Sequence, residues 1–256
     1  MADATSIDWR GIERERLEEM QRAGNVVLDC LRRMGKSHTN PIRQILGDQV
    51  EFIEFEHYPP GDIYDEESAS QYYYHAHRTE SGEHGHLHLF IRAAGIPSDI
   101  EPLAAVNADE RPLGPDAICH LIAISMDGEG LPCSMFTTNR WVTGETLYAA
   151  ADVIRLLDRF DVDHVTPCLA TNRFVSSLVR LFRPQIEALV RDRDRCLRDW
   201  SRTVGASAVF EHEALEVTSS MPIDIDAQIE RLDAELSSLG LCCAWDVTDR
   251  AGTRRA

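Results

Sequence analysis

Five histidines lie close together in the middle of the chain, and their alternating spacing is the feature of the sequence best suited to chemistry. They make up half of the protein's ten histidines: His75, His77, His84, His86 and His88. Imidazole is the commonest protein ligand for metal ions, and a short histidine-rich tract is itself a compositional sign of metal binding. The tract therefore predicts a metal site.

The spacing of the histidines indicates two β-strands, over residues 71–78 and 83–92. The first strand carries two of the histidines and the second carries three. Residues i and i+2 of a strand point to the same face of a sheet. The histidines of each strand are therefore expected to share one face.

The turn between these strands decides whether the two sets of histidines meet. A two-residue loop at residues 81–82 puts His77 opposite His86 and His75 opposite His88, on one face of a hairpin. A three-residue loop would separate the two sets. With the two-residue loop, the other face of the hairpin carries side chains that suit a core, namely Tyr72, Tyr74, Leu87, Leu89 and Ile91.

Imidazoles on neighbouring strands can reach a single metal ion. Opposed residues have Cβ atoms about 4.5–5.5 Å apart, which suits metal–nitrogen distances of about 2.0–2.1 Å. Three histidines and a water form a catalytic zinc site, whereas two histidines with Glu80 or Glu83 would resemble the site of non-haem iron oxygenases. The predicted cofactor is a divalent ion of iron, zinc or manganese. Its predicted ligands are His75, His77 and His86, with His88 able to replace any one of them.

The neighbours of these ligands could supply the other groups that a metal-dependent enzyme needs. Glu83 and His84 are the predicted proton carriers, and Tyr73 is the predicted hydrogen-bond donor behind the ligands. An open coordination position would indicate a hydrolase or an oxygenase. A closed site would indicate a non-catalytic accessory or sensor protein that binds metal or a small ligand. Without metal, the histidines could line a cleft as proton carriers, so the sequence does not decide whether the protein is an enzyme.

Two further histidines lie where they could approach the cluster. His120 occupies an apolar strand and is expected to be a hydrogen-bonded core residue, unless that strand neighbours residues 83–92. His57 precedes a turn and could approach from the next strand, and Asp62 or Asp65 could add a carboxylate.

The segment from Pro60-Gly61 to His75-Ala76-His77 resembles the His-x-His strand motif of the cupin family, which are metal-binding β-barrels. The resemblance implies a geometry in which both histidines bind one ion. The chain departs from the cupin pattern because Glu80 lies close to His77 and no second histidine motif follows residues 130–132. It also becomes helical where a cupin adds strands. The resemblance therefore bears on ligand geometry and not on the fold.

The hydrophobic pattern predicts an α+β fold with an antiparallel sheet of about five strands (residues 49–138), flanked by N-terminal and C-terminal helices. The chain is expected to form one domain over 1–205 and a C-terminal appendage over 206–256. The other predicted strands cover 49–57 (ended by a turn at 58–62), 117–126, 132–138 and 207–217. The predicted helices cover 8–34, 41–46, 144–160, a segment from about 171, a segment from 184 to 202, and 226–238.

Composition limits the partners that the protein can have. The chain has 256 residues and a formal net charge of −17, which disfavours binding to nucleic acid or to an anionic membrane. The expected partner is a small-molecule ligand or substrate, and the oligomeric state is left open. Seven cysteines without CxxC spacing, no visible secretory signal and no apolar run of about 20 residues favour a cytoplasmic location.

Overall fold

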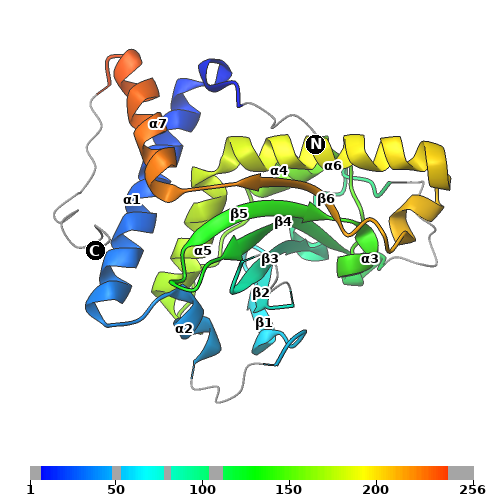
Figure 1. The fold of residues 1–256 in the computed structure, drawn as a ribbon, viewed down its shortest axis with the longest axis horizontal. Helices are drawn as coiled ribbons and strands as arrows, with labels where there is room; N and C mark the ends of the chain where they lie inside the picture. The colour runs from blue at the N-terminus through cyan, green and yellow to red at the C-terminus, as the bar shows by residue number, and fades with distance from the viewer. Residues whose placement is uncertain (1–6, 48–52, 78–81, 104–111, 242–256) are drawn as a thin grey trace.

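A six-stranded antiparallel sheet organises the residues that the computed structural model describes, 7–47, 53–77, 82–103 and 112–241 (Figure 1). Its strands lie side by side in chain order, so each strand pairs with the one before it. The predicted α+β class is confirmed. The strands are β1 (Tyr58–Asp65), β2 (Ser70–His75), β3 (Gly85–Arg92), β4 (Ile118–Met126), β5 (Pro132–Thr138) and β6 (Val217–Pro222).

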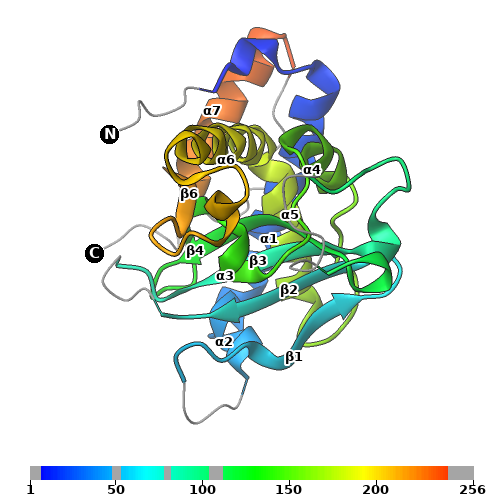
Figure 2. The ribbon, with the colours of Figure 1, turned by 90° about the vertical axis from the view of Figure 1, so that its right-hand side faces the viewer.

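Helices cover one face of this sheet. Figure 2 shows α4 and α6 above the strands, and Figure 1 shows α1 and α7 side by side at one end of the sheet, where α1 packs against α5. None of the helices in the described ranges has the length and apolar character that crossing a bilayer requires. The helices are α1 (Arg14–Lys36), α2 (Pro41–Leu46), α3 (Arg140–Thr143), α4 (Ala150–Leu157), α5 (Leu169–Leu181), α6 (Arg183–Val204) and α7 (Ile225–Ser238).

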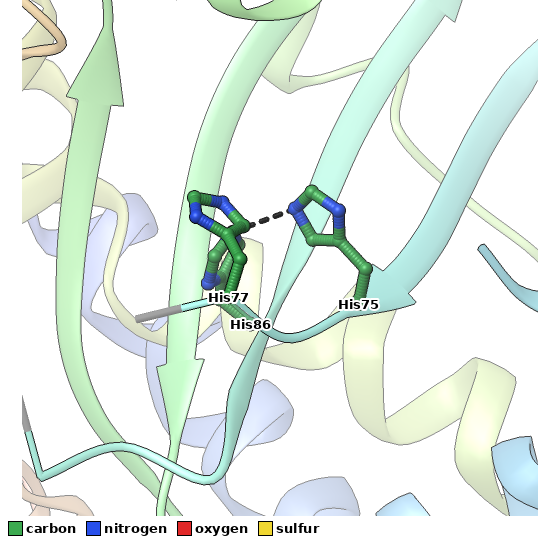
Figure 3. Close-up of side chains that lie close together, drawn as sticks. All are labelled: His75, His77 and His86. Atoms are coloured by element: carbon green, nitrogen blue, oxygen red, sulfur yellow. Dashed lines mark hydrogen bonds between the residues drawn. The ribbon is translucent and has the colours of Figure 1, made fainter. Parts of the chain in front are cut away.

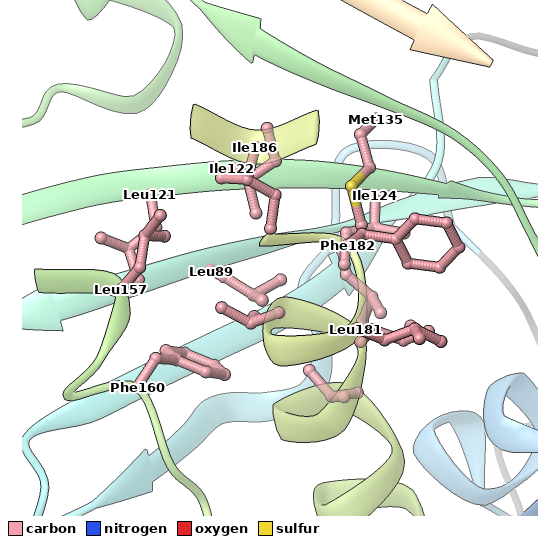
Figure 4. Packing of buried hydrophobic residues seen from close by; sticks show 14 of the residues in the cluster. Leu89, Leu121, Ile122, Ile124, Met135, Leu157, Phe160, Leu181, Phe182 and Ile186 are labelled. Atoms are coloured by element: carbon pink, nitrogen blue, oxygen red, sulfur yellow. The ribbon is translucent and has the colours of Figure 1, made fainter. Parts of the chain in front are cut away.

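The main hydrophobic core lies between the sheet and the helices (Figure 4). Its strand residues alternate with the histidines, because successive side chains of a strand point to opposite faces. The predicted core face is confirmed, and each of its members is fully buried: Tyr72, Tyr74, Leu87, Leu89 and Ile91. The histidine side chains of β2 and β3 consequently lie on the sheet face opposite these core residues.

A buried hydrogen bond joins the sheet to α5 within this core. The Tyr72 hydroxyl donates to the Asn172 side-chain oxygen over 2.6 Å. Tyr72→Phe leaves that oxygen buried without its donor, so we expect the free energy of unfolding to fall by roughly 1–3 kcal/mol. Urea denaturation measures the change. Tyr64→Phe, at an exposed ring, is the control, and an equal effect of both variants would contradict the expectation.

The observed register of the β2–β3 hairpin differs from the predicted one by two residues. His75 lies opposite His86, and Tyr73 lies opposite His88. A shift of two residues preserves the faces because the side-chain period of a strand is two. The expectation of a shared face is therefore confirmed for His75, His86 and His88, whereas the predicted pairs were wrong. His84 precedes β3 and contacts Tyr74 of the core face instead. The turn residues 78–81 lie outside the described residues.

The first predicted strand, over 49–57, was wrong for the residues that the structure describes. Residues 53–57 form a loop, and β1 begins only at Tyr58 and runs through the segment expected to be a turn. Residues 48–52 lie outside the described ranges. Proline lacks a backbone N–H and is tolerated in edge strands, and β1 is an edge strand. Its pairing with β2 is irregular between Tyr58 and Ile63, across the two prolines.

The C-terminal region supplies the other edge of the sheet. The strand expected over 207–217 was misplaced, since a 3₁₀ helix occupies Ala208–Glu211 and the strand is β6, paired antiparallel with β5. The helix expected over 144–160 is also shorter, because α4 begins at Ala150. The division at residue 205 remains a prediction.

Candidate metal centre

Three histidines converge where the β2–β3 hairpin approaches its turn (Figure 3). His75 ends β2, His77 follows two residues later, and His86 lies on β3 directly opposite His75. One ligand nitrogen from each lies within 4.8 Å of the others. Among the described residues, this is the group of histidine, cysteine or carboxylate side chains that could hold a metal ion. We refer to it below as the histidine triad.

The two buried rings of the histidine triad face each other directly. The Nε2 atoms of His75 and His86 are 2.7 Å apart (Figure 3), which is a hydrogen-bond distance. Two nitrogens bound to one tetrahedral ion lie about 3.3 Å apart, given metal–nitrogen distances of about 2.0–2.1 Å. Metal binding therefore requires these rings to separate by a few tenths of an ångström.

Burial keeps His75 of the triad in the protonation state that binds metal. His75 is 8% exposed and His86 is 1% exposed, whereas His77 is half-buried. Burial, together with the nearby His86, His77 and His57, lowers the pKa of His75 to about 3. His75 is consequently neutral near pH 7, and a neutral imidazole has the lone pair that a metal ion needs.

Glu83 orients one of the triad histidines. Its Oε1 lies 2.8 Å from Nδ1 of His86, and both side chains are buried. A carboxylate in this position holds the ring proton on Nδ1, which leaves Nε2 free as a ligand. The sequence predicted Glu83 as a proton carrier or a ligand. The geometry instead favours an orienting role, with the catalytic role still a prediction.

Loss of the Glu83 charge should weaken metal binding. Glu83→Gln keeps the shape of the side chain but removes the carboxylate that polarises His86. We expect the affinity for a divalent ion to fall by about 10–100-fold, as for other groups that orient metal-binding histidines. Competition with a chromophoric chelator measures the affinity. Glu129→Gln, in the exposed β4–β5 turn, is the control, and unchanged affinity in Glu83→Gln would argue against the orienting role.

His88 and His120 extend the cluster across the sheet. His88 lies on β3 beside the triad, with its ring centroid 4.9 Å from that of His86. Its Nδ1 is 3.0 Å from Nε2 of His120 on β4, and both rings are buried. β4 neighbours β3, so His120 meets the cluster, which was one of the two alternatives in the sequence. A ligand role for His88 remains a prediction, and its hydrogen bond directs Nδ1 away from the triad.

His84 contacts a different part of the hairpin. Its Nδ1 lies 2.6 Å from the hydroxyl of Tyr74, a residue of the core face. Gly85 permits this contact, because a Cβ atom there would come within 2.4 Å of the same hydroxyl. A role for His84 in proton transfer stays a prediction, and its exposed ring is not part of the triad.

The loop before β1 supplies a histidine and β1 supplies a carboxylate that form a second histidine–carboxylate pair at the site. The His57 ring stacks on Tyr73 at a centroid distance of 3.6 Å and meets His75 edge-on at 5.7 Å. Its Nδ1 is 3.0 Å from Oδ1 of Asp62. Tyr73 also lies edge-on to His75 at 5.3 Å, and burial raises its pKa, so its phenol is neutral. The sequence placed His57 only as a residue that could approach.

Comparison with known proteins places the chain in a family without assigning it a reaction. No curated protein and no solved structure shows significant similarity to it. Residues 21–223 match the family described as "Domain of unknown function (DUF6969)". The matched span runs from within α1 to the end of β6 and contains all six strands of the described residues and all histidines of the cluster. The chain therefore belongs to the DUF6969 family.

Proposed function

We propose that the protein is a mononuclear metal-dependent enzyme whose ion is held by the histidine triad. The convergence of three histidine nitrogens within 4.8 Å of one another carries the proposal. Catalytic metal sites commonly use three protein ligands and keep a further position for water or substrate. The separate hydrophobic core between sheet and helices supports a functional rather than a structural ion, because a chain of this length folds without one.

The ligand set favours hydrolysis or hydration over oxygenation. A two-histidine, one-carboxylate site is typical of non-haem iron oxygenases, but the nearest buried carboxylate, Glu83, is hydrogen-bonded to His86. Three histidines match the ligands of hydrolytic and hydrating zinc sites. A divalent ion bound there would act as a Lewis acid and would make water a better nucleophile. Iron and manganese remain alternatives to zinc.

His57 is the proposed proton carrier. Asp62 accepts a hydrogen bond from Nδ1 of His57, which leaves Nε2 able to take a proton from water or substrate. The His57 side chain is 42% exposed, so a substrate can reach it. The strongly negative chain supports a small molecule, rather than nucleic acid or a membrane, as the substrate.

Reconstitution of the purified protein separately with Zn²⁺, Fe²⁺ and Mn²⁺ tests this proposal. Each form is assayed for hydrolysis of a panel of esters, amides and lactones, and for oxygen consumption. We expect hydrolytic turnover that disappears in His77→Ala. In His57→Ala we expect it to fall by about 10²–10⁴-fold with metal still bound. Stoichiometric metal binding without turnover would instead support the accessory or sensor role.

A further inference from the structure

A groove of about 650 Å³ lies between the loop at residues 53–57 and the β1 edge of the sheet. Two aromatic rings, a histidine, an amide and two charged groups form much of its lining: Phe55, Tyr64, His57, Gln71, Asp62 and Arg92. The metal proposal uses only His57 and Asp62 of these. The remaining side chains have no role in holding the ion.

One end of the groove reaches the histidine triad. The Phe55 ring stacks on His77 at a centroid distance of 5.1 Å and an interplanar angle of 17°. The ring centroid of His57 lies 5.7 Å from that of His75. A molecule held in the groove would therefore have one end beside the proposed ion.

The charges in the groove leave one cation for a ligand. Asp62 is already engaged through both oxygens, Oδ1 with His57 at 3.0 Å and Oδ2 with the Gln71 amide at 2.6 Å. Arg92 is half-buried, and within the described residues its side chain makes no ion pair. A guanidinium binds a carboxylate through two parallel hydrogen bonds. A single arginine near Asp62 and Glu56 suits a monoanion better than a phosphate dianion.

The walls of the groove suit an apolar ligand body. Phe55 is 68% exposed and Tyr64 is 41% exposed, and exposed aromatic rings that line a groove offer contact area for an apolar body. Phe55 and Asp62 also have φ angles of 68° and 59°. Such backbone strain in residues other than glycine concentrates at functional sites.

The length of the groove indicates an elongated ligand. Gln71 lies beside the Arg92 end, whereas His75 belongs to the triad, and the two are four residues apart on β2. Four residues of strand span about 14 Å. A ligand that contacts both ends would carry its anionic group several bonds away from the group at the ion.

We propose that this groove is the substrate site and binds an elongated organic monocarboxylate. Its carboxylate pairs with Arg92, its apolar body lies against Phe55 and Tyr64, and its reacting group lies at the histidine triad. This inference rests on the proposed metal-dependent activity. The binding of the carboxylate by Arg92 can nevertheless be measured without the metal.

The test uses 4-phenylbutyrate as the probe, titrated by calorimetry into the full-length, metal-free protein. The uncharged 4-phenylbutyramide and inorganic phosphate are titrated in parallel. We expect saturable binding of the carboxylate and binding weaker by about 10–100-fold for the amide, as for loss of a charge-assisted hydrogen-bond pair. Arg92→Gln should weaken carboxylate binding by a similar factor. Arg92→Lys should weaken it by less, because lysine keeps the positive charge but lacks the two parallel N–H donors of the guanidinium. Arg22→Gln, at an exposed arginine of α1, is the control.

Several results would overturn the inference. They are no binding of 4-phenylbutyrate to the wild-type protein, equal binding by Arg92→Gln, an equal loss in Arg22→Gln, or phosphate binding as tight as that of the carboxylate. His86→Ala separates this inference from the proposed function, since His86 is a triad ligand whose hydrogen-bond and ring contacts within the described residues include no residue of the groove. This variant should lose metal and still bind the probe. Arg92-dependent probe binding to a protein that takes up no metal would refute the metal enzyme alone. Metal uptake without Arg92-dependent probe binding would refute the groove alone.

Discussion

Substitution of His77 by alanine is expected to remove tight metal binding while the protein stays folded. His77 supplies one of the three converging nitrogens, but it lies beyond the end of β2 and is only half-buried. Its loss leaves two ligands, which hold an ion far less tightly than three. The affinity should therefore fall by more than the factor of about 10–100 expected for an orienting residue.

His84→Ala is the matched control for this experiment. His84 lies on the same hairpin, is exposed, and bonds to Tyr74 instead of joining the triad. Metal affinity in this variant should equal that of the wild-type protein, and circular dichroism should show that both variants are folded. Equal losses of metal affinity in the two variants would mean that the histidines of residues 75–88 bind metal collectively and that the triad is not a specific site. A loss of turnover in His84→Ala with metal retained would support the predicted role in proton transfer.

The metal-free protein is expected to lose stability as the pH falls below about 6.5. Burial lowers the pKa of both His75 and His120 to about 3, and burial also lowers the pKa of His88. Between pH 6.5 and about 3, His75 and His120 bind protons in the unfolded chain but not in the folded one, and the lowered pKa of His88 acts in the same direction. Each proton taken up on unfolding lowers the free energy of unfolding by about 1.4 kcal/mol per pH unit.

One buried acid opposes this trend without reversing it. Burial raises the pKa of Glu145 to about 7, so between pH 4.5 and 7 it is protonated mainly in the folded state. It contributes stability that is lost as the pH rises. Because three histidines act in the other direction, the net effect still favours unfolding in acid. Urea denaturation between pH 8 and pH 4 measures how the free energy of unfolding depends on pH. A free energy of unfolding that stays constant or rises as the pH falls would contradict the assignment of buried neutral histidines.

The alternation of side chains made the two faces of the hairpin predictable. Tyr72 and Tyr74 alternate with Tyr73 and His75, and the same period continues on β3, so a core face and a histidine face could be assigned without knowing the turn. The exact pairing depends on the length of the turn. A difference of two residues changes which histidines oppose each other without moving any of them to the other face.

The hydrophobic pattern of the sequence could not predict the part of the site that lies on β1. Consecutive prolines and Gly61 are typical of a turn, yet this segment forms an edge strand, where missing N–H groups and an irregular register are tolerated. The contacts of His57 with Tyr73 and of Asp62 with Gln71 follow from that strand. They join residues that periodicity alone cannot place side by side. β6 likewise pairs with β5 across more than 70 residues of intervening chain.

The most direct test of the metal centre is the coordination of an ion bound to the purified, untagged protein. Elemental analysis after reconstitution, combined with X-ray absorption spectroscopy, reports the stoichiometry and the ligand atoms. The triad predicts one divalent ion per chain with three imidazole nitrogens at about 2.0–2.1 Å, and loss of that signal in both His75→Ala and His77→Ala. A protein that takes up no metal, or one whose bound ion is unchanged in those variants, would contradict it.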